Sequence, residues 1–505
     1  MANLCKPKFK VLSSFSQVGG IPLLCTLWER FDLSLLLSQS GIFKVRGVAT
    51  WVLAFLYVVG LINRSPSVNA LSSFYNQDGL LQQTLGAKKI SQSALSRFLT
   101  GFSGWDVFNN KRTERLQDDT DTALTNGDVL ALDDTHAPHP YAKKIPFLYW
   151  LYDSSSKTYT WAMNIVALHA VRRNGVEYPW SYSIWKKPES ETAKESSKLD
   201  LAWRMLQDVR KQVSCRLWVV MDRWYFSKPF LRQCESANFD WITKAKRNTK
   251  LFRRLIEPGT GRERFVPIQP IDLIREVYPR LKMQPKAKVA SVVCQDIYIQ
   301  MPTEKRNRKG QMIIKMKYTP IAAVVGWRVK EESKDTERSR IDTTDESDHE
   351  PAADYKGAYL LMSNRHDVPQ EVLGAWLRRW NIEILFRTAK QELGMLNCHS
   401  QNENHIHAHL TLLFTAETLI RYLLWAQRKT AGKEDCTHGQ VIRNLICIRC
   451  HTRRVHSRNK PDSITLDLDT VAKDFARLIR RLWPPNLEIG WFCPFSTNQL
   501  LGTTA

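Results

Sequence analysis

Apolar side chains near the start of the chain recur with the spacing of helices. They follow one another every three or four positions from about residue 23 to 37 and from 48 to 62, a pattern that predicts helices buried along one side. Two shorter helices are predicted over 79–86 and 91–100. We therefore expect residues 1–122 to form a helical region.

Between residues 123 and 248 the pattern changes to that of buried strands. Short, continuous apolar runs are separated by amphipathic helices at about 197–213 and from 228 onward. Continuous apolar runs bounded by turns favour strands that are covered on both faces. We expect an α/β sheet with strands at about 129–132, 158–171, 178–184, 216–221 and 239–243.

Residues 249–355 carry the pattern of strands alone and predict an all-β insertion, most clearly at 287–301 and 311–329. Within it, 330–354 is charged and rich in Ser and Thr, so we expect a solvated or disordered loop. The α/β pattern then resumes. We expect residues 356–425 to complete the α/β core and residues 426–505 to form a helical, basic C-terminal region.

The apolar run over 48–62 is the nearest approach to a membrane span. It has fifteen residues, whereas a helix needs about 18 to 20 to cross a bilayer, so a buried helix is favoured and no membrane partner is expected. The ten Cys residues have no framework spacing, and no apolar signal segment opens the chain. We expect reduced thiols and a cytoplasmic location.

The charge of the chain favours a polyanion as its partner. Lys and Arg number 73 and Asp and Glu 50, which gives a net charge of +23, and each cation placed on a phosphate releases a counterion. With Ser91 as a suitable N-cap, the helices over 79–86 and 91–100 predict either a helix-turn-helix that reads DNA or a plain helical bundle.

One predicted helix carries an unusual set of side chains. Over residues 376–390, helical spacing brings one carboxylate, three cations and an indole to a single face: Trp376, Arg379, Glu383, Arg387 and Lys390. Such a face is suited to holding a metal ion and clamping a phosphate chain around it. A second, apolar face is expected to dock the helix on a core through Leu373, Leu377, Trp380 and Ile384.

Two further carboxylates follow buried strands. Asp134 and Asp222 each come at the carboxyl end of an apolar run, which is the edge of an α/β sheet where ligands bind. Together with Glu383 they would supply three carboxylate ligands that suit Mg²⁺ or Mn²⁺. Phosphodiester chemistry leads us to expect two such ions. Asp133 is the alternative to Asp134 for this role, because adjacent strand residues face opposite ways and only one of the two can point into the site.

These motifs resemble the prokaryotic insertion-sequence DDE transposases with a Tyr-Arg-Glu-Lys signature. Arg379, Glu383 and Lys390 stand at the signature's spacing, and Trp376 replaces its Tyr. Asp134, followed by Thr, and Asp222, followed by Arg-Trp-Tyr, look like the family's two Asp motifs. The resemblance implies a ribonuclease-H-like core with a β insertion between the second Asp and the Glu, and it implies that Asp134, Asp222 and Glu383 are catalytic metal ligands.

The resemblance also implies a reaction and its partners. These transposases cleave transposon ends through a hairpin intermediate and transfer the strand into target DNA. The partners would be double-stranded DNA, namely terminal inverted repeats and target, and a second copy of the chain in a homodimer. The location would be the prokaryotic cytoplasm, associated with the nucleoid when bound to DNA.

DNA-contacting residues are implied in the same way. Hairpin formation needs aromatic side chains that hold a flipped base, and Tyr359 and Trp327 are the candidates. Lys244, Lys246 and Arg247 look like the family's basic motif that binds end DNA. For all five residues, an ordinary core or loop role is the alternative.

Three alternatives stay open at this point. The chain could be a DNA-binding protein derived from a transposase but catalytically silent, or a non-transposing nuclease of the same fold. Separately, Cys447, Cys450 and His451 have spacing like that of zinc ligands, although no second Cys-x-x-Cys pair exists and packing is the favoured role.

Overall fold

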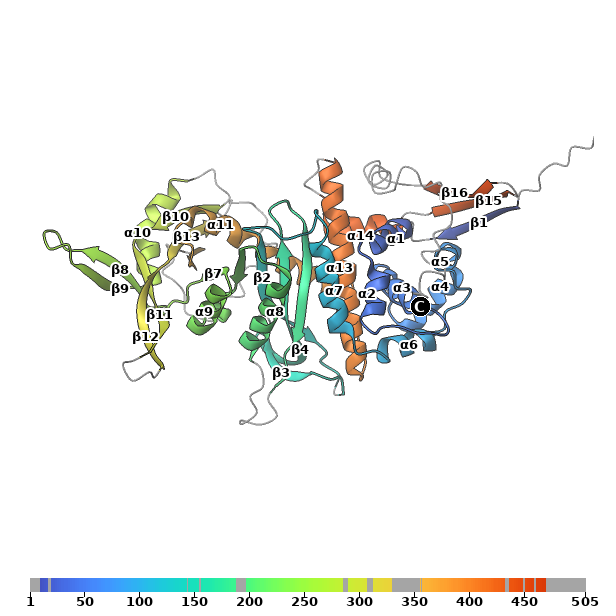
Figure 1. Ribbon diagram of the computed structural model, residues 1–505, viewed down its shortest axis with the longest axis horizontal. Helices are drawn as coiled ribbons and strands as arrows, with labels where there is room; N and C mark the ends of the chain where they lie inside the picture. The colour runs from blue at the N-terminus through green and yellow to red at the C-terminus, as the bar shows by residue number, and fades with distance from the viewer. Residues whose placement is uncertain are drawn as a thin grey trace, which may run out of the picture.

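The computed structural model has a large central sheet with the N-terminal helices to one side and a smaller sheet to the other (Figure 1). Chain segments far apart in sequence meet in the central sheet. The structure describes residues 10–16, 20–142, 144–153, 156–187, 197–284, 289–306, 312–328, 355, 357–431, 436–447, 450–457 and 460–468. The charged loop expected over 330–354 therefore lies outside the described residues.

The central sheet is mixed. Its strands lie in the order β10-β13-β14-β7-β6-β2-β4-β3, and β5 also pairs with β4. β2, β6 and β7 run parallel to one another, and the remaining pairs are antiparallel. The bounds are β2 Val129–Pro138, β3 Tyr149–Asp153, β4 Thr158–Val171, β5 Glu177–Ile184, β6 Leu217–Met221, β7 Phe239–Lys244, β10 Val289–Cys294, β13 Ala322–Arg328 and β14 Ala358–Ser363.

Helices cover both faces of this sheet, as the continuous apolar runs predict. α11 (Pro369–Leu377) packs on one face against a core that includes Trp218, Val220 and Ile242. α8 (Lys198–Gln212), which starts at a capping box formed by Ser197, packs against β4 and β5. The other helices of this region are α9 Lys228–Ser236 and α12 Trp380–Gln391, and a short 3₁₀ turn, η1, spans Arg223–Tyr225.

The expected all-β insertion was wrong in two respects. It contains a helix, α10 (Pro270–Lys282), which begins with Pro at N1 and a capping box between Gln269 and Asp272. In addition, β10 and β13 extend the central sheet instead of forming a separate unit. A smaller sheet of order β12-β11-β8-β9 is formed by β8 Leu251–Ile256, β9 Glu263–Ile268, β11 Ile297–Arg306 and β12 Met312–Pro320.

The N-terminal helices pack on a long helix from the C-terminal half, α13 (Glu403–Ala431), which stands between them and the sheet (Figure 1). The helix expected over 23–37 is divided at Asp32, whose φ of 52° is left-handed. Ser91 caps α6 as predicted. The bounds are α1 Ile21–Arg30, α2 Leu33–Gln39, α3 Thr50–Ile62, α4 Val68–Gln77, α5 Gly79–Leu85, α6 Gln92–Thr100 and α7 Trp105–Gln117.

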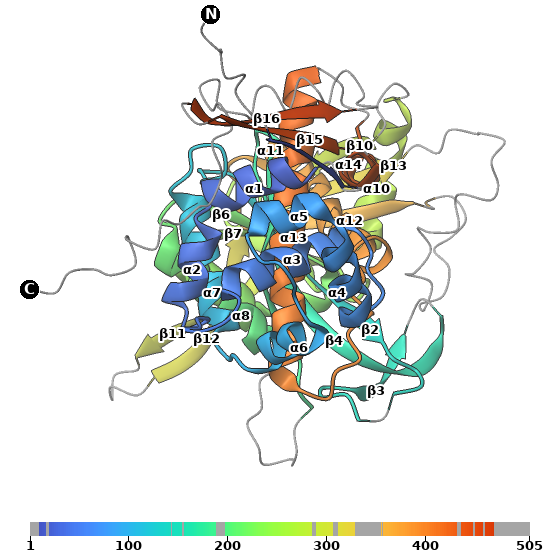
Figure 2. The same ribbon diagram turned by 90° about the vertical axis from the view of Figure 1, so that its right-hand side faces the viewer.

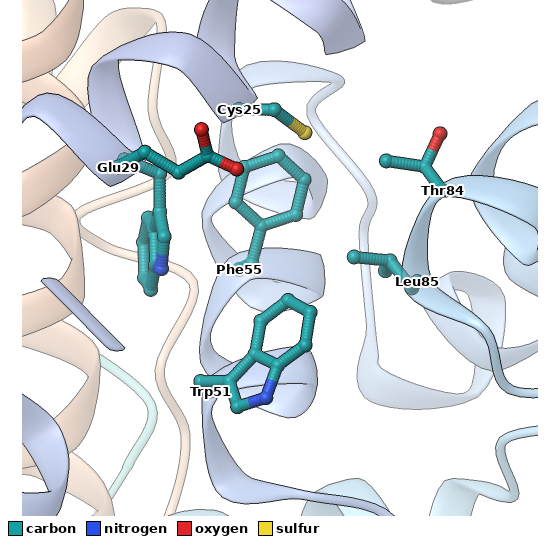
Figure 3. A pocket seen from close by; sticks show the side chains of 7 residues that line it. Cys25, Glu29, Trp51, Phe55, Thr84 and Leu85 are labelled. Carbon is teal, nitrogen blue, oxygen red and sulfur yellow. The ribbon is translucent and has the colours of Figure 1, made fainter. Parts of the chain in front are cut away.

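The apolar run at 48–62 forms α3, which is buried along nearly its whole length. Among the described residues, none of the helices combines the length and apolar character needed to cross a membrane. Beside α3, a small hollow is lined by aromatic rings and holds the carboxylate of Glu29 and the thiol of Cys25 (Figure 3).

The two ends of the described chain pair with each other. β1 (Lys10–Ser16) runs antiparallel to β15 (Cys450–Ser457), which pairs with β16 (Lys460–Leu468). This small sheet lies beside α5 and near α14 (His438–Cys447), over the N-terminal helices (Figure 2). The expectation of helices alone in both terminal regions was therefore wrong, because each strand gains its partner from the opposite end of the sequence.

Candidate active site

The parallel pairing of β2 with β6 places two carboxylates side by side. The paired register ends with Leu132 opposite Met221, so Asp133 and Asp222 are the next residues on each strand. Asp133 continues in β2, because that strand runs on to Pro138 instead of ending at the apolar run. Asp222 leaves β6 and precedes η1, and its side chain does not cap that turn.

Arg379 joins this edge of the sheet to Glu383. Its Nη1 lies 2.9 Å from Asp133 Oδ2, and its Nη2 lies 2.5 Å from Glu383 Oε1. The Arg379 side chain is buried, so the guanidinium is held between the two carboxylates and is screened little by water. Residues from β2 and the first turn of α12 are thereby fixed relative to each other.

Asp134 points to the other face of β2, where three donors surround it. Lys198 Nζ and Asn164 Nδ2 each lie 2.7 Å from Asp134 Oδ2, and Tyr225 OH donates to Oδ1 at 3.1 Å. Lys198 is the first residue of α8 and also lies 5.0 Å from the centre of the Trp224 ring. The Asp134 carboxylate is therefore held by an ammonium, an amide and a phenol.

The ionisation of Asp133 reflects this crowding. Burial raises the pKa of Asp133 to about 7; Arg379 opposes the rise, while Asp134 and Asp222 add to it. For Arg379, burial alone would lower the pKa, but Asp133 and Glu383 outweigh that effect and hold the pKa above its ordinary value. The edge of the sheet therefore concentrates negative charge that attracts cations.

The expected single helix over 376–390 is broken. α11 ends at Leu377 and α12 begins at Trp380, and at the junction Arg378 and Arg379 hydrogen-bond to residues three positions earlier. The expected apolar docking face was wrong at two positions, because Leu377 is 46% exposed and Trp380 38% exposed, whereas Leu373 does pack against the core. The buried positions are instead Val372, Ala375, Trp376, Ile382, Leu385, Phe386 and Ala389.

A family model described as "Transposase DDE domain" matches residues 125–419, more than half of the chain. The chain belongs to the transposase DDE domain family. The matched segment includes β2, β6 and α12 and ends within α13. A search of curated proteins gives no match.

Within this DDE domain, four of the residues expected to contact DNA form a continuous row. Arg379 lies 5.0 Å from the centre of the Trp376 ring, and Lys244 lies 5.6 Å from the same ring and 5.2 Å from the ring of Tyr359. Trp376 is only 6% exposed, so its indole supports the two cations instead of offering an open face. A Cβ at Gly326 would clash with Tyr359, which explains the glycine beneath that ring.

The remaining expected contacts are more dispersed. Trp327 lies on the opposite face of the sheet from Tyr359, because Tyr359 pairs with Gly326 and successive side chains alternate; its ring packs edge-on against Tyr278 of α10. The geometry therefore separates the two aromatic candidates for holding a flipped base. Of the remaining cations, Arg247 and Arg387 are exposed, whereas Lys246 and Lys390 are half-buried.

The donor chemistry of the DDE domain fits a hard divalent cation. Carboxylate oxygens are the preferred ligands of Mg²⁺ and Mn²⁺, and Lys198 and Arg379 show that these carboxylates attract positive charge. Asn164 also presents a buried Oδ1 with no hydrogen-bond partner in the described part of the chain. Across those same residues, however, no three His, Cys, Asp or Glu side chains already lie close enough together to hold a metal ion.

The zinc alternative falls on side chains outside the described residues and is not tested. The side chains of Cys447, Cys450 and His451 lie outside the description. Nearby, His438 Nε2 lies 3.0 Å from Glu417 Oε2 in a buried ion-pair network. That imidazole is therefore engaged by a carboxylate.

Three residues of the site were not predicted from the sequence: Lys198, Asn164 and Tyr225. Lys198 begins a helix and Asn164 lies within an apolar strand, so neither has a sequence signal that links it to Asp134. Tyr225 carried a usable signal, because it follows Asp222 closely in the run Asp-Arg-Trp-Tyr. Its pKa is well above the ordinary value, chiefly because of burial and then because Asp134 is near.

Proposed function

We propose that this protein is a metal-dependent DNA transposase that cleaves transposon ends and joins them to target DNA. The observation that carries the proposal is the bridge from Asp133 through Arg379 to Glu383, beside Asp222 and Asp134. Carboxylates from two strands and a helix gather at one edge of the sheet, within a chain that belongs to the DDE family. Phosphodiester chemistry with divalent cations uses carboxylate ligands of this kind.

Asp134, Asp222 and Glu383 are the proposed catalytic residues and metal ligands, with two Mg²⁺ or Mn²⁺ ions. When bound, such ions activate a water or 3′-hydroxyl and stabilise the leaving oxygen. Asp133 is assigned a different role, because its carboxylate is buried and paired with Arg379. It orients Arg379, which in turn holds Glu383.

The basic and aromatic residues are proposed to position the DNA. Lys244, Lys246, Arg247, Arg387 and Lys390 supply cations for the phosphate backbone. Tyr359 is the better placed of the two flipped-base candidates, since the Lys244 ammonium lies over its ring and over that of Trp376. Trp327 packs against α10 and is assigned a supporting role in that part of the fold.

The finer steps follow from the resemblance to the Tyr-Arg-Glu-Lys group. Hydrolysis at the element end would free a 3′-hydroxyl, whose attack on the opposite strand forms a hairpin; hairpin opening and strand transfer would follow. α5 and α6 are proposed to read terminal inverted repeats as a helix-turn-helix. Synapsis of two ends would require a homodimer, acting on DNA in a prokaryotic cytoplasm.

Incubation with a supercoiled plasmid that carries the element's ends tests the proposal. We expect nicking and linearisation with Mg²⁺ or Mn²⁺, none with EDTA, and joined donor–target products when target DNA is added. Nicking without joining would indicate a non-transposing nuclease. Binding without cutting would indicate a catalytically silent DNA-binding protein.

A matched pair of variants connects the activity to the site. Glu383→Gln removes a carboxylate while preserving shape, and we expect DNA binding without cleavage. Glu403→Gln, an exposed glutamate at the start of α13, is the control and should cut normally. Full cleavage by Glu383→Gln would refute the proposed site.

A further inference from the structure

An exposed ladder of aromatic rings runs along the hairpin formed by β3 and β4. Tyr152 pairs with Tyr159, and Trp150 pairs with Trp161, so the four side chains share one face. Trp150 is 57% exposed, Tyr152 50% and Tyr159 58%. The rings of Trp150 and Tyr159 are stacked, with centroids 6.4 Å apart and planes inclined by 11°.

The ladder is not part of a described core. β3 is the last strand of the central sheet, and the hairpin lies at the margin of the molecule (Figure 2). Proteins normally protect an edge strand with charges, prolines or a covering segment, whereas this one presents large rings to water. Contiguous exposed apolar surface of this kind marks an interaction site.

The ladder continues the face of the sheet that carries Asp133. Ile165 of β4 pairs with Thr135, which shares the face of Asp133, and alternate residues lead from Ile165 to Trp161. Four residues of extended strand separate them, or about 13 Å. The ladder therefore lies on the same face of the sheet as Asp133, farther along β4.

Exposed lysines lie near both ends of the hairpin. Lys157 lies exposed in the turn between β3 and β4. Lys186 and Lys187 are exposed just after β5, and the neighbouring Trp185 packs edge-on against Tyr149 of β3. Flat rings bordered by lysines form the kind of surface that binds single-stranded nucleic acid, because bases stack on the rings while phosphates meet the ammonium groups.

We propose that Trp150, Tyr152 and Tyr159 bind single-stranded DNA by stacking on its bases. This inference rests on the proposed function, since strands separate next to the site when an end is opened for cleavage. An exposed edge strand can also pair with a second copy of the chain. The exposed lysines near this hairpin favour DNA over that pairing.

Fluorescence anisotropy with the full-length protein tests the proposal. The probes are a labelled 12-nucleotide single strand and the same sequence as a duplex, both in EDTA so that no cleavage occurs. We expect Trp150→Ala and Tyr152→Ala each to weaken single-strand binding about fivefold or more and to change duplex binding by less than about twofold. Trp150→Phe and Tyr152→Phe retain a ring and should restore most of the affinity.

Ile314→Ala is the matched control, because Ile314 is 73% exposed on the edge strand β12 and has no ring. It should bind both probes like the unaltered protein. The proposal would be overturned if the alanine variants bound the single strand as tightly as the unaltered protein. It would also be overturned if light scattering showed that the variants that lose binding also lose the dimer. The binding assay needs no catalysis. A protein that does not cleave DNA would refute the proposed function, but single-strand binding could still be measured.

Discussion

The guanidinium of Arg379 lies 2.9 Å from the carboxylate of Asp133, although 246 residues separate them in the chain. The same guanidinium also contacts Glu383. One buried cation therefore fixes the helix that carries the Glu relative to the strand that carries the Asp pair. Removing one partner of a buried, hydrogen-bonded pair leaves a charge without compensation, which is costly.

We expect Arg379→Ala to reduce cleavage about a hundredfold or more while changing DNA affinity by less than about threefold, because the side chain is buried and engaged with carboxylates. Arg379→Lys should recover little, since an ammonium lacks the two-pronged geometry of a guanidinium. Rates of end cleavage and binding isotherms for both variants provide the measurement. A large loss of DNA affinity with a weaker salt dependence would instead show that Arg379 contacts a DNA phosphate.

Arg387 should behave in the opposite way, because it is exposed on the same helix. Arg387→Ala is expected to weaken DNA binding and to reduce the slope of log K against log salt by about 0.9, the effect of one lost phosphate contact. Titrations at several salt concentrations measure the slope. An unchanged slope would show that α12 does not present this side chain to the DNA backbone.

The stability of the fold depends on a buried carboxylate behind α12. Glu417 accepts from Thr388 of α12 at 2.7 Å and from Arg421 at 2.8 Å, and it also pairs with His438. Burial alone would raise the pKa of Glu417, but His438 and Arg421 hold it at about 2. Glu417→Ala should lower the free energy of unfolding by about 3–5 kcal/mol, as measured by urea denaturation.

The exposed Glu403 of the same helix supplies the control for that measurement. Glu403→Ala should change stability by less than about 0.5 kcal/mol. Similar losses for both variants would contradict a special role for the Glu417 network.

The effect of Glu29 on stability should depend on pH. Burial raises its pKa to about 7 in the hollow beside α3 (Figure 3). The folded state favours the protonated form of Glu29. The contribution of Glu29 to stability is therefore complete below the ordinary pKa of a glutamate and is lost as pH rises through about 7. Glu29→Gln should therefore raise Tm relative to the unaltered protein at pH 8 but not at pH 4.

Thermal melts across that pH range provide the measurement for Glu29. Glu114→Gln, at an exposed position of α7, should show no such pH-dependent difference. A Glu29→Gln advantage that is larger at pH 4 than at pH 8 would contradict the assignment.

The strands of the catalytic edge could be predicted because their side chains are buried on both faces. β6 and the first half of β2 are continuous apolar runs, and the carboxylates that follow them stand out. The start of α8 was equally accessible, since Ser197 and Asp200 form a local capping box. Such signals lie within a few residues and need no knowledge of distant partners.

The break between α11 and α12 could not be predicted in this way. No Gly or Pro interrupts the sequence from Trp376 to Lys390, and the junction lies where Arg379 reaches Asp133 across the fold. The same limit applies to Lys198, whose contact with Asp134 depends on how α8 packs. Long-range contacts decide these features, and the terminal strand β1 likewise finds its partner in β15.

Binding of Mn²⁺ to the protein on uncleavable end DNA, followed by the electron paramagnetic resonance of free Mn²⁺, tests the central claim most directly. We expect the unaltered protein and Asp133→Asn to remove Mn²⁺ from solution, and Asp134→Asn, Asp222→Asn and Glu383→Gln to fail. Undiminished Mn²⁺ binding by these last three variants would contradict the account.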